Sequence, residues 1–306
     1  MINVIKNDEL GADFSVLLTH GETQLASCTV WIKNAPCGPD GAPSAAIGKF
    51  DADSFDHAKQ VLDRACEIIR EHGISSVVGP MDGNTWRRYR FVTYSNGSEP
   101  FILELTNPPE YPGYFEGAGF SPVSQYFSKR SVLADKYDKT HLYKAELEKR
   151  GITFRTLRAD ELDKDLDIIY DISHIAFKDN LYYTELDRES FKKQYYAYKD
   201  YLVPQYILIA SDNGKPAGFV FCIPDYNEMK TGGHIETLVA KTIAVMPEYR
   251  KMHLGSAMLN TAYEHAYQDG LRSAVIALVY SGNVSDNLIE DGSSYVRKYT
   301  LYKKEL

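Results

Sequence analysis

One stretch, TIAVMPEYRKMHLGSAML at residues 242–259, decides the fold because it reads as a strand, a turn and a helix. Pro247 lacks a backbone donor and so helps to end the strand. The N-terminus of a helix exposes unpaired N–H groups and a partial positive charge, and it therefore binds anions. Gly255 and the small residues after it let a phosphate approach the backbone, and Arg250 and Lys251 add positive charge. The stretch thus predicts a phosphate-binding loop.

The bulk properties are those of an ordinary globular protein. The chain has 306 residues, of which 44% are hydrophobic and 25% charged, and its net charge is -8. This length suits two domains, and the acidic balance argues against general nucleic-acid binding. No signal peptide or membrane-spanning run is expected. The four cysteines have neither metal nor redox spacing, so we expect reduced thiols, no metal and a cytoplasmic location.

The second half of the chain alternates strands and helices, which is typical of a mixed sheet flanked by helices. Strands are expected at residues 152–157, 205–223 (a hairpin that turns at 212–215), 239–246, 273–280 and 295–305. Helices are expected at residues 161–177, 187–202, 254–270 and 285–292. The fold class is therefore α/β.

The first half follows a related plan. Strands are expected at residues 14–20, 24–33, 45–52, 75–80, 100–105 and 121–130, and a helix at 54–73. A charged, helical segment lies between the halves. We therefore divide the chain into a first lobe at 1–134, a connector helix at 135–150 and a second lobe at 151–306.

The phosphate loop has a specific likeness. Arg250, His253 and Gly255 occupy the three fixed places of the acetyl-CoA loop of the GNAT acyltransferases, which the stretch resembles. The likeness covers the second lobe in element order, and the whole chain resembles bacterial two-lobed GNAT proteins of unassigned substrate. Further stretches that carry it are GFVFCIPDYN and YVRKYTLYKKEL in the second lobe, and VVGPMDG and NPPEYPGYFEGAGF in the first. It implies a GNAT fold with a centrally splayed sheet, in two tandem lobes of which the first is degenerate.

His253 stands where this loop usually carries glycine. Glycine is preferred where φ is positive or where the cofactor crowds the backbone. Histidine enters the left-handed region more often than most side chains, so the loop can keep its shape at some conformational cost. The alternative is a degenerate loop that has lost the cofactor.

The resemblance also implies a set of cofactor-binding residues for acetyl-CoA. Two parallel strands, in 239–246 and 273–280, would splay apart to admit the pantetheine arm. The residues so implied are Ile243, Ala244, Val245, Arg250, Lys251, Met252, His253, Leu254, Gly255, Ser256, Asn283 and its rival Asn287.

The first lobe is expected to bind no cofactor. At its equivalent turn, Asp51, Asp53 and Ser54 crowd the start of the helix, where they would cap it and repel phosphate. This lobe is either structural or lines the acceptor pocket. Candidate acceptor-binding residues from the stretches NTWRRYR and TNPPEY are Trp86, Arg88, Tyr89, Asn107 and Tyr111.

Acyl transfer to an amine needs a neutral amine and a proton for the departing thiolate. In several relatives a glutamate lies on the strand where this chain has Lys241, so that role does not carry over. Glu236 and Asp225 are nearby alternatives. A C-terminal tyrosine is expected to protonate the thiolate. The candidates are Tyr299, narrowly ahead of Tyr302, and Tyr295.

The leading hypothesis is an acetyl-CoA-dependent N-acetyltransferase that acts on a primary amine of a small molecule or peptide. Lys241 and His253 favour a second hypothesis, a non-catalytic protein that binds acyl-CoA or a partner. A third, an aminoacyl-tRNA-dependent peptidyl transferase, is opposed by the acidic net charge. The sequence identifies neither the acceptor nor the oligomeric state.

Overall fold

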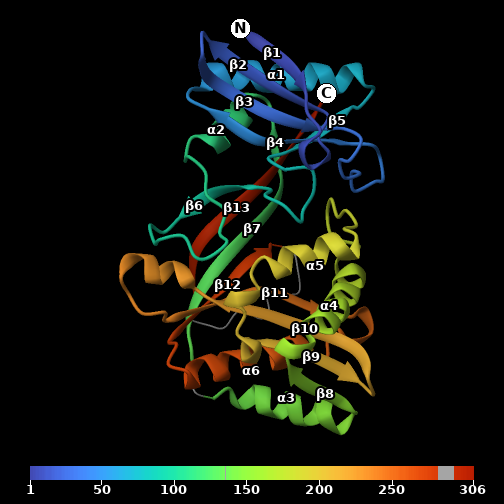
Figure 1. The fold of residues 1–306 in the computed structure, drawn as a ribbon, viewed down its shortest axis with the longest axis vertical. Coiled ribbons are helices and arrows are strands. Elements are labelled where there is room, and N and C mark those ends of the chain that lie inside the picture. Colours follow the sequence, from blue (N-terminus) through green and yellow to red (C-terminus); the bar gives the residue numbers. More distant parts are fainter. Residues whose placement is uncertain (135, 282–292) are drawn as a thin grey trace.

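A computed structural model describes residues 1–134, 136–281 and 293–306. Its strands form one 13-stranded sheet that runs through two lobes. In Figure 1 the first lobe lies at the top and the second at the bottom, and β7 and β13 run side by side between them. The two lobes are therefore joined by strands as well as by the connector.

The first lobe holds a meander of antiparallel strands that is covered by one long helix. Its elements are β1 (Ile2–Lys6), β2 (Phe14–His20), β3 (Thr23–Trp31), β4 (Ala45–Ala52), α1 (Phe55–Glu71), β5 (Ser76–Gly79), β6 (Phe91–Ser95), α2 (Tyr111–Gly117) and β7 (Ser121–Val132). The apolar face of α1 packs on this sheet, with Leu62 and Ile69 fully buried.

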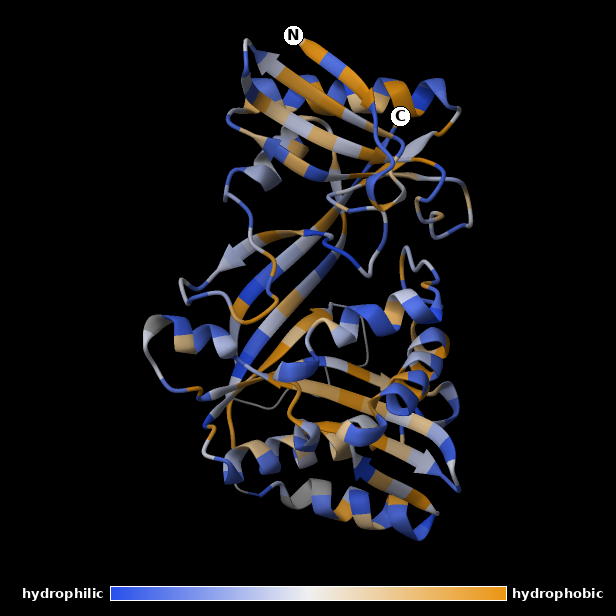
Figure 2. Ribbon diagram, in the orientation of Figure 1, coloured by the Kyte–Doolittle hydropathy of each residue, from blue (hydrophilic) through white to orange (hydrophobic). Residues whose placement is uncertain are grey.

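The second lobe has the order of elements that the sequence predicts. After the connector helix α3 (Asp138–Lys149), its elements are β8 (Ile152–Thr156), α4 (Leu162–Phe177), α5 (Arg188–Tyr196), β9 (Ile207–Asp212), β10 (Lys215–Pro224), β11 (Thr237–Val245), α6 (Leu254–Gln268), β12 (Ser273–Tyr280) and β13 (Ser294–Glu305). Figure 2 shows the apolar strands of this lobe lying between more polar helices. The mixed α/β class and the tandem arrangement are confirmed.

The sheet of each lobe is extended by the last strand of the other lobe. The order of the sheet is β1-β2-β3-β4-β5-β13-β7-β12-β11-β10-β9-β8, with β6 pairing on β13. The final strand of the chain, β13, thus extends the first-lobe sheet at β5, and β7 extends the second-lobe sheet at β12. The boundaries predicted at residues 134 and 151 do not follow this hydrogen bonding, because each lobe's sheet takes in a strand from the other side.

Local signals predicted several elements well. Ser54 caps α1 by accepting from the backbone N–H of His57. The hairpin of β9 and β10 turns at Asn213 and Gly214, both with positive φ, as a tight two-residue turn requires. The helix predicted at 187–202 is shorter, since α5 ends at Tyr196 and a single 3-10 turn follows it.

The strand predicted at 100–105 is wrong. Residues 101–105 form a turn in which Leu103 has φ 61°, and Phe101 and Ile102 pack onto apolar residues of β10, β11 and β12. The apolar side chains of Phe101 and Ile102 thus pack between the lobes, and this segment does not pair as a strand. The strands β1 and β6 are additional to the predicted set, and the helix predicted at 285–292 lies outside the described residues.

Candidate functional site

The predicted splay lies between β11 and β12. These parallel strands pair from Thr237 with Ser273 to Ala240 with Ile276, and no further. Beyond that point β11 stays paired with β10 as far as Val245. The described part of β12 instead continues along β7, with a bulge at Leu278, whose φ is 60°. Among the described residues, the edge of β11 at 241–245 therefore has no strand partner on the β12 side.

Lys241 sits where the splay begins. Ala240 pairs with Cys222 and Thr242 pairs with Phe221, so Lys241 is an extra residue in β11. Such a bulge bends the strand and re-aims a side chain. The Lys241 ammonium donates to the carbonyl of Leu103 at 3.4 Å, across the boundary between the lobes. Burial, followed by the charge of Arg90, lowers the pKa of Lys241 to about 8, against the opposing effect of Glu104.

The loop after β11 has the shape that its sequence predicts. Lys251 and His253 have φ of 66° and 58°, so His253 does adopt the left-handed conformation. Its ring stacks on Tyr143 of α3, with 4.1 Å between ring centroids and 6° between planes. Its side chain makes no capping hydrogen bond at the start of α6. The first N–H groups of α6 therefore remain available to an anion.

The other predicted cofactor residues surround this loop. Arg250 donates from Nη2 to the carbonyl of Ala176 at 3.0 Å, which ties the loop to the end of α4. Leu254 and Gly255 are buried in the first turn of α6, whereas Met252 and Ser256 are partly exposed and Lys251 is exposed. Asn283 and Asn287 lie outside the described residues.

Most of the predicted acceptor residues hold the protein together. Trp86 donates to the carbonyl of Thr184 at 2.7 Å and thereby joins the lobes, and Arg88 donates to the carbonyl of Thr106 at 2.8 Å. Asn107 accepts from the backbone of Val92 at 2.7 Å.

Tyr111 is buried in the first-lobe core, and its hydroxyl donates to Asp51 at 2.6 Å. Tyr89 differs from these residues, because its ring covers the guanidinium of Arg90, with 3.9 Å from Cζ to the ring centroid. Of the predicted acceptor residues, Tyr89 thus contacts Arg90, which lies where the two lobes meet.

Two residues at the middle of the molecule, Arg90 and Glu104, were not identified by the sequence analysis. Arg90 has φ 72°, and its Cζ lies 3.9 Å from the ring centroids of both Tyr89 and Tyr126. Glu104 follows the apolar residues 101–103, which read as part of a strand. Arg90 is the last residue of the stretch NTWRRYR, which also contains the candidates Trp86, Arg88 and Tyr89. Its position beside these candidates was the sequence signal that could have identified it.

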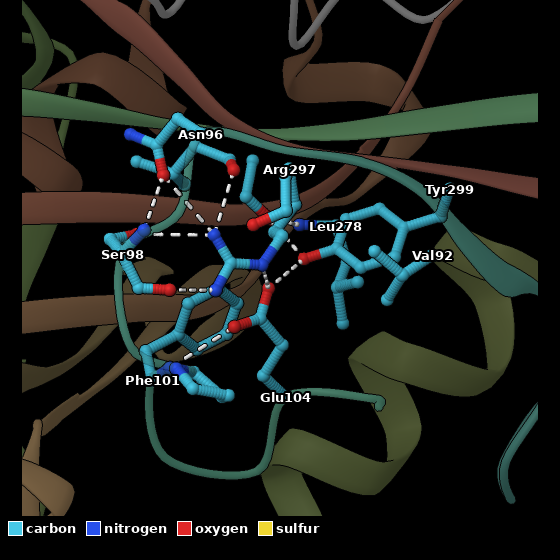
Figure 3. A network of polar contacts seen from close by, with 12 residues as sticks. Val92, Asn96, Ser98, Phe101, Glu104, Leu278, Arg297 and Tyr299 are labelled. Carbon is cyan, nitrogen blue, oxygen red and sulfur yellow. Dashed lines mark hydrogen bonds and ion pairs between the residues drawn. The ribbon is translucent and has the colours of Figure 1, made fainter. Parts of the chain in front are cut away.

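Glu104 anchors the polar network in Figure 3. Its side chain has 0% exposure, and it accepts from the Tyr299 hydroxyl at 2.6 Å and from the Phe101 N–H at 3.1 Å. The Nε of Arg297 lies 3.4 Å from the same carboxylate. Burial raises the pKa of Glu104 more than these partners lower it. A carboxylate from the first lobe is thus bound by two residues of the last strand.

Tyr299 is the candidate tyrosine that lies beside the splay. Its hydroxyl contacts Ser128 at 3.0 Å, and Ser128 accepts from the N–H of Leu278 in β12 at 3.0 Å. Tyr299 itself has 0% exposure. Burial, the charge of Glu104 and the hydrogen bond to it raise the pKa of the phenol. Its hydroxyl is therefore committed within the protein.

The remaining catalytic candidates lie in other surroundings. Tyr302 belongs to the first-lobe core and donates to Glu116 at 3.0 Å, whereas Tyr295 is 43% exposed and packs on Phe127. Glu236 is exposed just before β11. Asp225 is buried and accepts from the N–H of Ile102 at 2.8 Å, which suits a link between the lobes.

We expect Tyr299→Phe to destabilise the protein by about 1.5–3 kcal/mol, because the buried Glu104 loses a hydrogen bond. Tyr295→Phe is the control and should leave the free energy of unfolding almost unchanged. Denaturant unfolding followed by circular dichroism measures both. Equal stability of the Tyr299→Phe variant and the parent would contradict the assigned network.

The described residues contain no group of three or more His, Cys, Asp or Glu that could hold a metal ion. Among the described helices, none combines the length and the apolar character needed to span a membrane.

The sequence and the structure were compared with those of known proteins. Residues 169–288 match the model of the acetyltransferase (GNAT) family. No curated protein matches the sequence significantly. Among solved structures, a GCN5-related N-acetyltransferase from Sphaerobacter thermophilus aligns with a TM-score of 0.55 at 14% identity, over 97% of this chain and 81% of that one.

Two further solved structures share the fold. A tandem GNAT protein from the clavulanic acid biosynthesis pathway has a TM-score of 0.52 at 13% identity, over 95% of this chain and 82% of that one. A glucosamine N-acetyltransferase region of a fungal multi-domain β-N-acetylglucosaminidase has a TM-score of 0.57 at 13% identity. That alignment covers 95% of this chain but 33% of the fungal one. At such identities the likeness concerns the fold alone.

Proposed function

We propose that this protein is an acetyl-CoA-dependent N-acetyltransferase, and the match of residues 169–288 to the model of the acetyltransferase (GNAT) family supports this proposal. Its second lobe would bind acetyl-CoA, and the acyl group would pass to a primary amine of a small molecule or peptide. The location would be cytoplasmic, which suits the four free cysteines.

One observation carries this proposal: the open edge of β11 leads directly into a loop with two left-handed residues and an uncapped helix. An unpaired strand edge suits the amide groups of a pantetheine arm, and an uncapped helix N-terminus suits a pyrophosphate. The residues present thus fit the cofactor in both polarity and order along the chain.

Acetyl-CoA, when bound, supplies a thioester whose acetyl carbon an amine can attack. The backbone of Ile243, Ala244 and Val245 would hold the arm, and an N–H of Ala244 or Val245 would polarise the carbonyl. The N–H groups at the start of α6, with Lys251, would hold the phosphates. Glu236 would accept the proton of the amine, and a C-terminal tyrosine would donate a proton to the departing thiolate.

A second candidate function is non-catalytic binding of acyl-CoA. Lys241 replaces a carboxylate at the start of the splay, and the hydroxyl of Tyr299 is committed to Glu104. Acetyl-CoA turnover with a panel of amines separates the two functions. Binding of acetyl-CoA without transfer to any amine would favour the second.

The proposed division, with a first lobe at 1–134, a connector at 135–150 and a second lobe at 151–306, assigns cofactor binding to the second lobe. In the first lobe Ser54 caps α1, Asp53 pairs with His57, and Asp51 accepts from Tyr111. The start of α1 is therefore occupied by the protein's own groups. This contrast with α6 supports a single site.

We expect isothermal titration with CoA to give a stoichiometry near one per chain. The control is Ser54→Ala, which uncaps α1 and should not create a second site, because Asp51 and Asp53 still repel phosphate. Two equivalent sites in the parent protein would contradict the assignment to one lobe. No binding at all would mean that the loop is a remnant.

A further inference from the structure

Two nitrogen atoms of a buried guanidinium at the junction of the lobes have no hydrogen-bond acceptor in the described structure. Arg90 is 8% exposed, and its Nε and Nη1 atoms are shielded from solvent without a hydrogen-bond partner in the described structure. Its Cζ lies 3.9 Å from the ring centroids of both Tyr89 and Tyr126, whose planes are perpendicular to each other. Stacking stabilises the cation, but buried N–H groups without acceptors are costly. The guanidinium therefore has unused capacity for an anion.

A second cation comes from the other lobe. Lys241 is partly exposed, and its charge and that of Arg90 interact. The nearby carboxylate of Glu104 is already bound by Tyr299, Arg297 and the N–H of Phe101. Glu104 therefore reduces the positive potential at the two cations without forming an ion pair within 4 Å with either of them in the described structure.

The position of this pair relative to the splay suggests its use. Lys241 precedes Ile243, where pairing with the pantetheine arm would start, whereas the phosphate loop follows Val245 at the other end. The two cations therefore lie at the opposite end of the open strand edge from the loop. This is the side from which an acceptor would meet the thioester, so the inference rests on the proposed function.

We propose that Arg90 and Lys241 form a binding site for an oxyanion, a carboxylate or a phosphate group, carried by the amine acceptor. The acceptor is thus an anionic amine. The perpendicular rings of Tyr89 and Tyr126 both contact the guanidinium and fix its position. The first lobe supplies one cation and the second lobe the other, so the acceptor is recognised only where the lobes meet.

Ligand-observed NMR tests this site with three matched probes: glycine, aminomethylphosphonate and glycinamide. The first two carry a carboxylate and a phosphonate, and the third is neutral at that position. We expect one or both anionic probes to bind, and glycinamide to bind at least about tenfold more weakly, as expected when a hydrogen bond to a charged group is lost. The stronger of the two anionic probes identifies the oxyanion.

Arg90→Met and Lys241→Met remove one cation each while keeping a long side chain. Each should weaken the anionic probes at least about tenfold. The control is Lys298→Met, an exposed lysine of β13, which should not change binding. Unchanged affinity in Arg90→Met, or no preference for the anionic probes over glycinamide, would overturn the proposal.

The pH dependence gives an independent signature. Acetate keeps its charge between pH 7 and pH 9, whereas Lys241, with a pKa of about 8, loses its proton over this range. Acetate binding should therefore weaken about tenfold from pH 7 to pH 9. Arg297, Tyr299 and Glu104 adjoin the site, but Lys241→Met should abolish the pH effect. Persistence of the effect in that variant would contradict the role of Lys241.

The result is separable from that of the proposed function. A titration with CoA, run on the same proteins, reports the loop at α6 and not the two cations. CoA binding without probe binding would overturn this inference and leave the proposed function standing. Probe binding without CoA binding would support an oxyanion site and overturn the proposed function.

Discussion

A chain that ends at residue 293, without β13, should fail to fold either lobe. This strand lies between β5 and β7, and it buries Val296, Tyr299, Leu301 and Tyr302. Burial of one large apolar side chain contributes roughly 1.5–3 kcal/mol. Four of them contribute on the order of 6–12 kcal/mol, which is similar to the whole stability of a typical domain at about 5–15 kcal/mol.

The comparison is with a chain that lacks residues 1–6. This removes β1, an edge strand whose side chains are mostly exposed and which pairs with β2 alone in the described sheet. The chain without residues 1–6 should retain a cooperative thermal transition by circular dichroism, whereas the chain without β13 should show none. A cooperative transition together with CoA binding in the chain without β13 would show that the second lobe folds without the exchanged strand.

Gly255→Val should weaken CoA binding at least about tenfold, or about 1.4 kcal/mol. The glycine lies in the first turn of α6, where the backbone N–H groups would face the phosphates. A branched side chain there would occupy the space of the ligand, and it would also lose rotamer freedom in the helix. Isothermal titration at one salt concentration measures the effect.

His253→Gly is the matched variant from the same loop, and its affinity for CoA should stay within about threefold of the parent's. Glycine relieves the left-handed conformation at φ 58°, but it removes the stack on Tyr143 and loosens the free loop. These effects oppose each other. Equal affinity of Gly255→Val and the parent would mean that the phosphates bind elsewhere, and a large loss in His253→Gly would mean that the ring itself contacts the ligand.

The sequence by itself determined the elements of the second lobe and the shape of its loop. Apolar residues at helical or alternating spacing, Pro247, Asn213 and Gly214 act through their own neighbours in the chain. The same holds for Ser54 at the start of α1 and for the left-handed His253. Caps, turns and backbone conformations need few distant contacts, so they can be read from a short window.

Only the tertiary structure decided which strands exchange and which charges meet. The segments of β7 and β13 both read as strands, but the pattern of a strand reports burial and not its neighbour in a sheet. Residues 101–105 looked like a strand because most of them are apolar, yet Phe101 and Ile102 pack onto the second-lobe part of the sheet.

Arg90 and Lys241 come from different lobes, and no spacing in the sequence connects them. Their proximity follows from the pairing of β7 with β13, which run side by side between the lobes and join the first lobe's sheet to that of the second. Contacts between residues far apart in the chain depend on the packing of whole elements. That packing is settled by the summed burial of many side chains, and no single motif encodes it.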